Sequence, residues 1–294
     1  MSSRAIIIDG NRLSSVAVAR IARGGEKVSV SSGAKIKAKA SRNFLLKRID
    51  ETVTYGVNTG FGPMASRIIG RDQRIELQYN LVRSHAVGMG APLRSEFVRA
   101  ALAVRLNTLA KGASGVDPKL LDYVAAMMNA DIVPIVPEHG AVGTSGDLVQ
   151  LAHCALAAIG EGECWYRGRR VSAASALKAI KLAPYTLGPK EGLALINGTA
   201  MMTGIGAVLV RDAERLVHLA TRAGALALEV VGGFSDSLDA SLHDLRPHIG
   251  QGEVAREMRA LLASSKLLRN REIFAKKTKQ ASGVREIPES VQEI

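Results

Sequence analysis

The chain has 294 residues, of which 47% are hydrophobic and 4% aromatic, and its formal net charge is +12. This hydrophobic content is enough for a packed core, and the shortage of aromatic residues favours closely packed helices over a β-sandwich. The two cysteines, Cys154 and Cys164, have neither CxxC nor metal-ligand spacing. The spacing excludes a disulfide framework and indicates free thiols in a reducing compartment, with no metal site expected.

The sequence contains no recognisable targeting or membrane-spanning segment. The first residues lack the apolar core of a signal peptide, and no run of about 18 uncharged apolar residues occurs, so we expect a cytoplasmic protein with no membrane partner. The Lys and Arg residues are scattered and are not interleaved with aromatic residues. Solvated helix faces therefore explain the charge better than a nucleic-acid interface, and no nucleic-acid partner is expected.

The N-terminal part predicts short strands and helices in alternation. Residues Ala5–Asp9 and Lys27–Val30 predict strands on either side of a helix at Leu13–Ile21, and an amphipathic, basic helix is predicted at Ala34–Val53. Glycines and Pro63 then interrupt the segment Thr54–Met64 and exclude a regular element there.

This glycine-rich segment is expected to present Tyr55 and Asn58 on a loop. Loops on a rigid scaffold carry function disproportionately often, although a single loop tyrosine is more often structural. In the next predicted helix, Arg74–Val87, Leu77, Leu81 and His85 share one face, so His85 is expected to point inward. Taken alone, such a histidine is more often a satisfied core residue than a ligand.

Two further helices are expected before the central loop, at Ser95–Lys111 and Pro118–Ala130, with Pro118 at the first helical position. The loop follows at Val136–His153, where glycines lead directly into a predicted helix at Asp147–Ile159. A carboxylate such as Asp147 is favoured at a helix N-terminus.

This loop has more than one interpretation. A phosphate-binding Walker A loop is excluded because no lysine follows the glycines, and the sequence Gly143-Thr-Ser-Gly-Asp147 does not fit the nucleophile elbow Gly-x-Ser-x-Gly. A simple cap on a core helix remains possible. The alternative is covalent: Gly146 N attacks the Thr144 carbonyl carbon and Ser145 loses water, which closes the tripeptide into an electrophilic methylidene-imidazolone. Such a closure requires a tight turn, which glycine permits.

The rest of the chain is predicted to be essentially helical. A hairpin is expected at Glu163–Val171 with its turn at Gly168, and Asn197 ends an apolar run, where it is expected to be buried as a structural tether or a ligand contact. Long helices are predicted at Thr199–Val231 and Glu253–Ala263. The segment Lys276–Pro288 is predicted to be a polar, basic loop.

Four segments in order along the chain resemble the aromatic amino acid ammonia-lyase family, which comprises histidine, tyrosine and phenylalanine lyases and related aminomutases. They are Tyr55-Gly-Val-Asn-Thr-Gly-Phe-Gly62, Leu77-Gln-Tyr-Asn-Leu-Val-Arg-Ser-His85, Gly143-Thr-Ser-Gly-Asp147 and Leu195-Ile-Asn-Gly-Thr199. The family usually begins its cyclised tripeptide with Ala, whereas this chain has Thr144. Because cyclisation uses only the carbonyl of that residue, the change is expected to be tolerated.

The resemblance implies a mainly α fold with small β elements. Residues 1–198 would form an N-terminal active-site domain that carries the cyclised tripeptide, and residues 199–294 would form the first part of a central helical bundle.

The resemblance also implies roles for individual residues. Ser145 would become the dehydroalanine of a group built autocatalytically from Thr144, Ser145 and Gly146, with no external cofactor. Tyr55 would remove the β-proton of the amino acid substrate, and Asn197 would orient the electrophile or the substrate amine.

Substrate contacts are implied for Gly62, Ser84, His85 and Asn197. Histidine at position 85 suits the phenol of tyrosine or an imidazole and argues against phenylalanine. Because the sequence after Asp147 resembles bacterial tyrosine lyases, L-tyrosine is the first expectation, histidine the second, and a tyrosine 2,3-aminomutase the third.

Members of the resembled family are considerably longer, and their C-terminal half supplies a carboxylate-binding arginine after a Val-Gln-Asp/Glu-x-Tyr-Ser-x-Arg motif. The similar Val291-Gln-Glu-Ile294 is where the chain ends. The chain is therefore expected to be the N-terminal part of a lyase that needs its C-terminal segment and forms a homotetramer with shared sites. A non-catalytic helical interaction module or a basic nucleic-acid binder would instead keep Ser145 as an ordinary serine.

Overall fold

The computed structural model describes residues 5–143 and 145–280, and it confirms the prediction of a mainly α protein with small strands. The chain divides into two compact units, the first ending at Arg211 and the second beginning at Asp212. The first unit contains all the named strands and the glycine-rich loop around Ser145. It is therefore the unit in which the predicted site residues can be located.

The first unit begins with a β-α-β arrangement, in which strand β1 (Ile6–Ile8) pairs in parallel with β2 (Val28–Val30). Helix α1 (Ser15–Gly24) connects them, and the Ser14 side chain accepts the Ala17 N–H at its start. Such a side-chain cap satisfies one of the backbone N–H groups that a helix leaves without a partner.

Helix α2 (Ser32–Arg48) ends earlier than the predicted Val53. The reason is Asn58, whose Nδ2 donates to the carbonyls of Ile49 (2.7 Å) and Thr52 (2.8 Å), while its Oδ1 accepts the Thr54 N–H (2.7 Å). These bonds turn the chain back on itself. The expectation that Asn58 is presented on a loop was wrong, because the side chain is buried and its amide is used to hold this turn.

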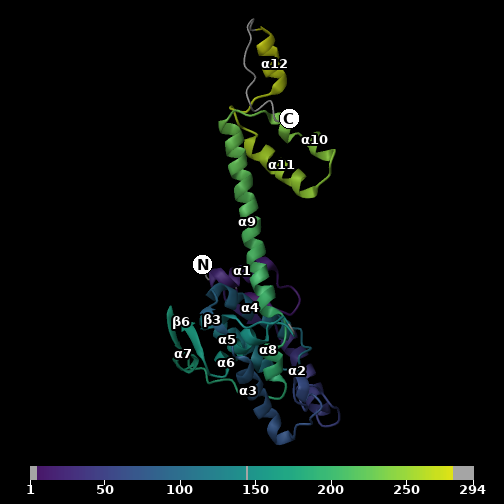
Figure 1. Ribbon diagram of the computed structural model, residues 1–294, viewed down its shortest axis with the longest axis vertical. Helices are drawn as coiled ribbons and strands as arrows, with labels where there is room; N and C mark the ends of the chain where they lie inside the picture. Colours follow the sequence, from purple (N-terminus) through teal and green to yellow (C-terminus); the bar gives the residue numbers. More distant parts are fainter. Residues whose placement is uncertain (1–4, 144, 281–294) are drawn as a thin grey trace. The chain divides into compact units, whose positions relative to one another are not determined.

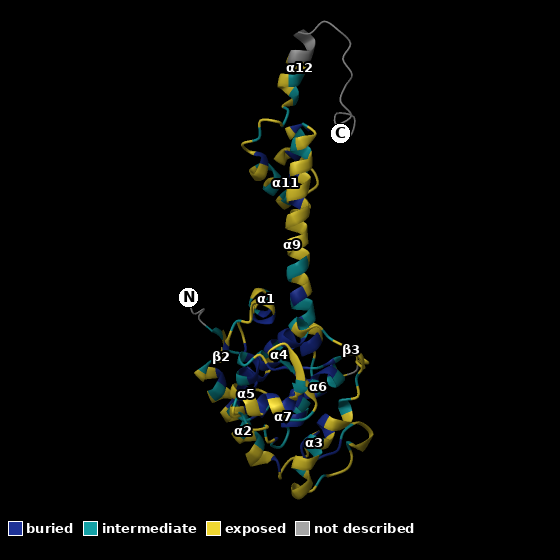
Figure 2. Cartoon of the chain, turned by 90° about the vertical axis from the view of Figure 1, so that its left-hand side faces the viewer, coloured by how far each residue is buried: buried dark blue, intermediate teal, exposed yellow. Residues whose placement is uncertain are grey.

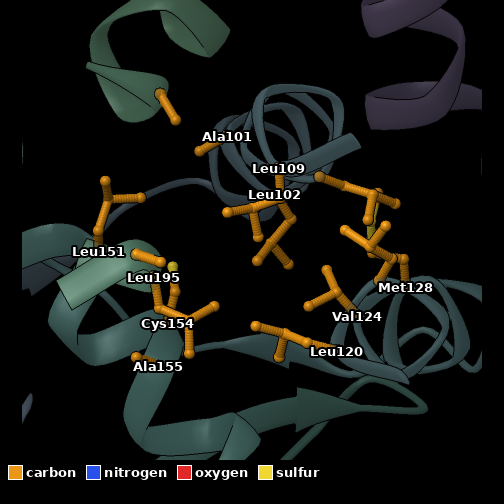
Figure 3. Packing of buried hydrophobic residues seen from close by; sticks show 14 of the residues in the cluster. Ala101, Leu102, Leu109, Leu120, Val124, Met128, Leu151, Cys154, Ala155 and Leu195 are labelled. Atoms are coloured by element: carbon orange, nitrogen blue, oxygen red, sulfur yellow. The ribbon is translucent and has the colours of Figure 1, made fainter. Parts of the chain in front are cut away.

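The core of the first unit is built around helix α4 (Ser95–Ala110), which is buried on nearly all sides (Figure 2). In Figure 3, Leu102 and Leu109 of α4 face Val124 of one neighbouring helix and Leu151 and Cys154 of another. Helices α1, α2 and α5 (Pro118–Asn129) pack directly on α4, and α6 (Leu148–Ala158) and α8 (Glu191–Ile196) face it across the core. Helix α3 (Arg74–His85) packs on α6 and α8 (Figure 1). Burial of these apolar side chains is the main stabilising term for the unit.

Two small antiparallel sheets lie beside these helices. The predicted hairpin is confirmed as β6 (Glu163–Tyr166) and β7 (Arg169–Ser172), with positive φ at Arg167 and Gly168 as a two-residue turn requires. The sequence did not reveal strands β3, β4 and β5, because each contains a proline, which weakens a strand signal. The remaining elements of this region are β3 (Met89–Pro92), β4 (Val133–Pro134), β5 (Pro137–His139), α7 (Ala173–Ala179), and the 3₁₀ turns η1 (Gly62–Met64) and η2 (Arg71–Gln73).

Helix α9 (Ala200–Val230) begins in the first unit and agrees with the long helix predicted there. In the second unit, Ala225, Leu238 and Leu262 form a small core. The other elements of that unit are η3 (Ser235–Leu238), α10 (Ala240–Asp244), α11 (Ile249–Leu262) and α12 (Arg271–Gln280).

The prediction of a basic loop was wrong for residues Lys276–Gln280, because these residues belong to helix α12. The helix begins after Asn270, whose Oδ1 accepts the Ile273 N–H at 3.2 Å. This cap was overlooked in the sequence, where the basic residues suggested a solvated loop. The rest of the predicted loop lies outside the described residues.

Candidate active site

The loop before α6 makes a tight turn at the predicted tripeptide. Gly143, Ser145 and Gly146 have φ angles of 71°, 59° and 85°. Positive φ is uncommon for a residue with a side chain, so the left-handed conformation of Ser145 marks a backbone held by its surroundings. Thr144 lies outside the described residues. The turn has the constrained backbone that the cyclisation hypothesis requires.

Gly146 lies against the backbone of Gly198, which follows Asn197 in the sequence. The two glycines form a parallel bridge, and the next residue, Asp147, donates its N–H to the Gly198 carbonyl at 2.8 Å. A Cβ atom at position 146 would lie 2.2 Å from the Gly198 oxygen. Position 146 therefore has no room for a side chain, and the tripeptide loop and the Asn197 turn are one structural feature.

Asp147 stands at the N-terminus of α6 as the sequence predicts, but its carboxylate does not cap that helix. Its Oδ2 accepts the backbone N–H groups of Met201 (2.8 Å) and Met202 (3.0 Å), in the first turn of α9. The side chain makes no cap hydrogen bond to α6. Asp147 therefore ties the tripeptide loop to the positive end of α9, where a carboxylate is favoured.

The buried guanidinium of Arg105 holds the other side of the Asn197 turn. Its Nη2 donates to the carbonyl of Ala194 and, at 2.8 Å, to that of Asn197. Burial lowers the pKa of Arg105 to about 10, and the charge of Asp147 partly opposes this shift. Asn197 itself was expected to be buried, but it is exposed. The structural-tether interpretation of its side chain was therefore wrong, and the amide is available to a ligand.

Tyr55 is 51% exposed, so it is not a core tyrosine. Its phenol oxygen accepts the Gly62 N–H at 3.1 Å, and its ring packs edge-to-face on Phe61 with centroids 5.8 Å apart. The structure thus brings the two predicted site residues Tyr55 and Gly62 into direct contact. The phenol group is fixed in place and is still accessible from solvent.

Gln78 connects this loop to α8 and was missed in the sequence. The side chain is completely buried, its Nε2 donates to the Gly56 carbonyl at 3.1 Å, and its Oε1 accepts the Leu193 N–H at 3.1 Å. The signal was present, because Gln78 lies three and four positions before Leu81 and Val82 on the buried face of α3. A polar residue on an apolar face must find partners, and here they belong to the two segments that carry Tyr55 and Asn197.

The end of α3 forms one wall of a groove of about 330 Å³ in which Phe61, Leu77, Leu81, Ser84 and His85 take part. His85 is half-buried at this wall instead of pointing fully inward. Its Nδ1 lies 2.9 Å from the Leu81 carbonyl oxygen, which can only accept a hydrogen bond. In the tautomer that donates from Nδ1 to this carbonyl, Nε2 is left as an acceptor.

The predicted site residues consequently form two groups. Ser145 and Gly146 lie with the Asn197 turn, whereas Tyr55 and Gly62 lie beside the groove that Ser84 and His85 line. Among the described residues, the hydrogen bonds of Gln78 connect the Tyr55 loop to α8, the helix that ends at Asn197.

A comparison with protein families matches residues 13–291 to the family described as aromatic amino acid lyase. The chain belongs to this family. The resemblance inferred from the four sequence motifs is thereby confirmed, and the matched segment includes all the predicted site residues.

Individual relatives in the lyase family carry several names. The chain is 45% identical over 270 residues to a probable histidine ammonia-lyase of Halobacterium salinarum, covering 91% of this chain and 51% of that protein. It is 42% identical to the histidine ammonia-lyase of Alkaliphilus metalliredigens, covering 90% and 52%. Among solved structures, the tyrosine aminomutase of Streptomyces globisporus has a TM-score of 0.89 and 38% identity, covering 97% and 55%.

The chain spans about half the length of the curated relatives it matches. Over the residues that the structure describes, no helix is long and apolar enough to cross a membrane. The same part of the chain contains no group of three or more His, Cys, Asp or Glu residues that could hold a metal ion.

Proposed function

We propose that the protein is an aromatic amino acid ammonia-lyase that eliminates ammonia from L-tyrosine to give 4-coumarate. The observation that carries the proposal is the turn at Ser145 and Gly146, which is held against Gly198 with no space for a side chain at position 146. A carbon–nitrogen lyase of this kind needs an electrophile for the amine and a positioned base for the poorly acidic β-proton.

The described residues fit a methylidene-imidazolone built from Thr144, Ser145 and Gly146. Closure of the ring joins the amide nitrogen of the third residue to the carbonyl carbon of the first and releases that carbonyl oxygen as one water, and dehydration of Ser145 releases a second. The positive φ angles of Ser145 and Gly146 are compatible with such a tight turn. The group would supply an electrophile that captures the substrate amine. The chain's own residues then have to orient the amino acid and remove its proton.

Tyr55 is the proposed base. The Gly62 N–H occupies one side of its phenol oxygen, and a hydrogen bond from an amide donor stabilises negative charge there. The exposed half of the ring leaves the oxygen accessible to a substrate. Asn197, whose side chain is exposed and whose backbone is fixed by Arg105, is proposed to orient the amine.

His85 supports tyrosine as the substrate. In the tautomer whose Nδ1–H donates to the Leu81 carbonyl, Nε2 is an acceptor, and a phenol O–H in the groove finds a partner there. Phenylalanine offers no such donor. Ser84 and Gly62 border the same region and are proposed as further substrate contacts.

Histidine is the second candidate substrate, and a specific observation favours it. The matched relatives at 45% and 42% identity are named histidine ammonia-lyases, and an imidazole N–H can also donate to Nε2 of His85. A tyrosine 2,3-aminomutase is the third candidate, supported by the similarity to the Streptomyces enzyme.

The exposed apolar side chains of helix α9 indicate that other protein segments cover this helix. Its exposed apolar side chains include Leu209 (50%), Leu216 (67%), Leu219 (60%) and Val230 (72%). A contiguous apolar face of this kind usually marks an interface. We propose that the C-terminal segment of the same protein and neighbouring subunits of a homotetramer cover it. Residues 199–294 would then form the first part of the central helical bundle, and residues 1–198 would form the active-site domain that carries the tripeptide.

Intact-mass measurement of the purified, folded protein tests the proposal. Cyclisation predicts a mass lower than the sequence mass by two waters, and Ser145→Ala should regain at least one of them. Ser84→Ala, which changes a serine outside the tripeptide in the same way, should keep the full deficit. An unmodified wild-type mass would exclude the electrophile, and assays for coumarate and urocanate with the full-length protein then separate tyrosine from histidine as substrate.

A further inference from the structure

We propose that Arg105 is a positioning residue that holds the Asn197–Gly198 turn and the Ser145–Gly146 turn in register, so that both tripeptide maturation and turnover depend on its guanidinium. The inference rests on the proposed function. It concerns a residue that lies outside the four sequence motifs and donates its hydrogen bonds to backbone carbonyls at the end of α8.

The guanidinium of Arg105 contacts the C-terminal end of α8. The last carbonyls of a helix have no partner within the helix and carry partial negative charge. Nη2 of Arg105 satisfies two of them, those of Ala194 and Asn197, and Asn197 is the residue at which α8 ends. Because the guanidinium fixes the direction of the Asn197 carbonyl, it also fixes the direction in which the exposed Asn197 side chain leaves the helix.

Gly198 connects the guanidinium of Arg105 to the tripeptide. A Cβ atom on Gly198 would lie 2.5 Å from Nη1 of Arg105, so the guanidinium lies directly against this glycine. On the same residue, the Gly198 carbonyl accepts the Asp147 N–H and leaves no space for a side chain at Gly146. A displacement of the guanidinium is therefore transmitted through Gly198 to the backbone whose amide must close the ring.

The charge of the Arg105 guanidinium lies in an unfavourable, buried environment. Arg105 is 6% exposed, its Nε lacks a hydrogen-bond partner, and it lines an apolar cavity of about 20 Å³ with Leu102, Leu151 and Cys154. Within the described residues, the carboxylate of Asp147 is the acidic group that acts on it electrostatically. A buried and incompletely paired cation is poor for stability, and a well-packed apolar residue is often better. Stability alone therefore does not explain an arginine at this position.

Helix α4 provides a matched control in Arg99. This arginine is also buried, at 8% exposure, and its Nε and Nη2 donate to the carbonyl of Ile21 in the last turn of α1. It further pairs with Asp131. Arg99 thus has the same chemistry, helix and burial as Arg105, but the helix end that it caps is away from the tripeptide.

The test compares Arg105→Lys with Arg99→Lys in the full-length protein. Both lysine variants should melt below wild type, because one ammonium group replaces a guanidinium that satisfies several acceptors. Arg99→Lys should show the complete two-water deficit and the wild-type kcat. Arg105→Lys should contain a large fraction of uncyclised chain, and its cyclised fraction should lose kcat by roughly tenfold to hundredfold with little change in KM, as a displaced catalytic constellation does.

The outcomes separate the inference from the proposed function. A wild-type protein without the two-water deficit overturns both. A cyclised wild type, together with a folded Arg105→Lys that matches Arg99→Lys in deficit and kcat, overturns only the role of Arg105. Should Arg105→Lys fail to fold, Arg105→Gln, which keeps N–H donors in a shorter neutral side chain, undergoes the same comparison at reduced temperature. Complete cyclisation in that variant contradicts the inference.

Discussion

Replacement of Gln78 by methionine tests whether this side chain joins the Tyr55 loop to α8. Methionine has a similar length and fills the same space, so the substitution removes two hydrogen bonds without opening a large cavity. It leaves the Gly56 carbonyl buried without its partner and the Leu193 N–H partly buried without its partner. The change therefore isolates the polar contribution of the bridge.

The magnitude follows from the burial of the two abandoned groups. An unsatisfied buried polar group costs about 1 to 3 kcal/mol, and we take about 2 kcal/mol for the Gly56 carbonyl and about 1 kcal/mol for the less buried Leu193 N–H. The free energy of unfolding should fall by about 3 kcal/mol. In a unit of this size, the melting temperature should fall by roughly 6 to 12 °C.

Urea unfolding and thermal melting measure the loss, with Gln73→Met as the control. Gln73 is an exposed glutamine in the turn before α3, and its replacement should change the free energy of unfolding by less than about 0.5 kcal/mol. If Gln78→Met is as stable as this control, the two hydrogen bonds do not support the fold as argued. A destabilised variant that keeps the full kcat would show that Tyr55 is positioned by other contacts.

Three further predictions concern single side chains. Tyr55→Phe should keep the melting temperature and reduce kcat by roughly 10² to 10⁴, the usual contribution of a positioned base, and full activity would remove Tyr55 from the mechanism. His85→Phe should shift the kcat/KM ratio towards phenylalanine and away from tyrosine by roughly tenfold to a hundredfold, because the phenol loses its acceptor; an unchanged ratio would place His85 outside the pocket. Burial lowers the pKa of His153, whose Nε2 accepts the Gly88 N–H, so below about pH 6.5 the unfolded chain binds a proton that the folded chain does not. The free energy of unfolding should therefore fall from about pH 7.5 to about pH 5.5, and by less in His153→Gln; equal pH dependence in both proteins would contradict the assignment.

The fold was predictable where local signals were strong. The apolar periodicity of α4 and α5 and the glycine turn of the hairpin at Gly168 gave elements close to those observed. The premature end of α2 was not predictable, because it is caused by a side chain ten positions later, Asn58, whose bonds require the folded loop.

The candidate site was predictable as a set of motifs but not as a set of contacts. Asp147 appeared to cap the helix that follows it, since a sequence shows the nearest helix start, whereas its carboxylate binds the start of α9 more than fifty positions away. Arg105 gave no signal at all, because an arginine in an otherwise apolar helix does not reveal which helix end it meets. Long-range pairings of this kind depend on the packing of whole helices.

The burial of α4 bears on the order in which the protein folds and matures. On the proposed role of Arg105, which reaches the Asn197 turn from the packed α4, the tripeptide acquires its backbone geometry after the core has formed. On the proposed chemistry, ring closure is a covalent change that unfolding does not reverse. A newly made chain and a chain refolded from urea are then different molecules, so first folding and refolding follow different kinetics and only the first includes a maturation step.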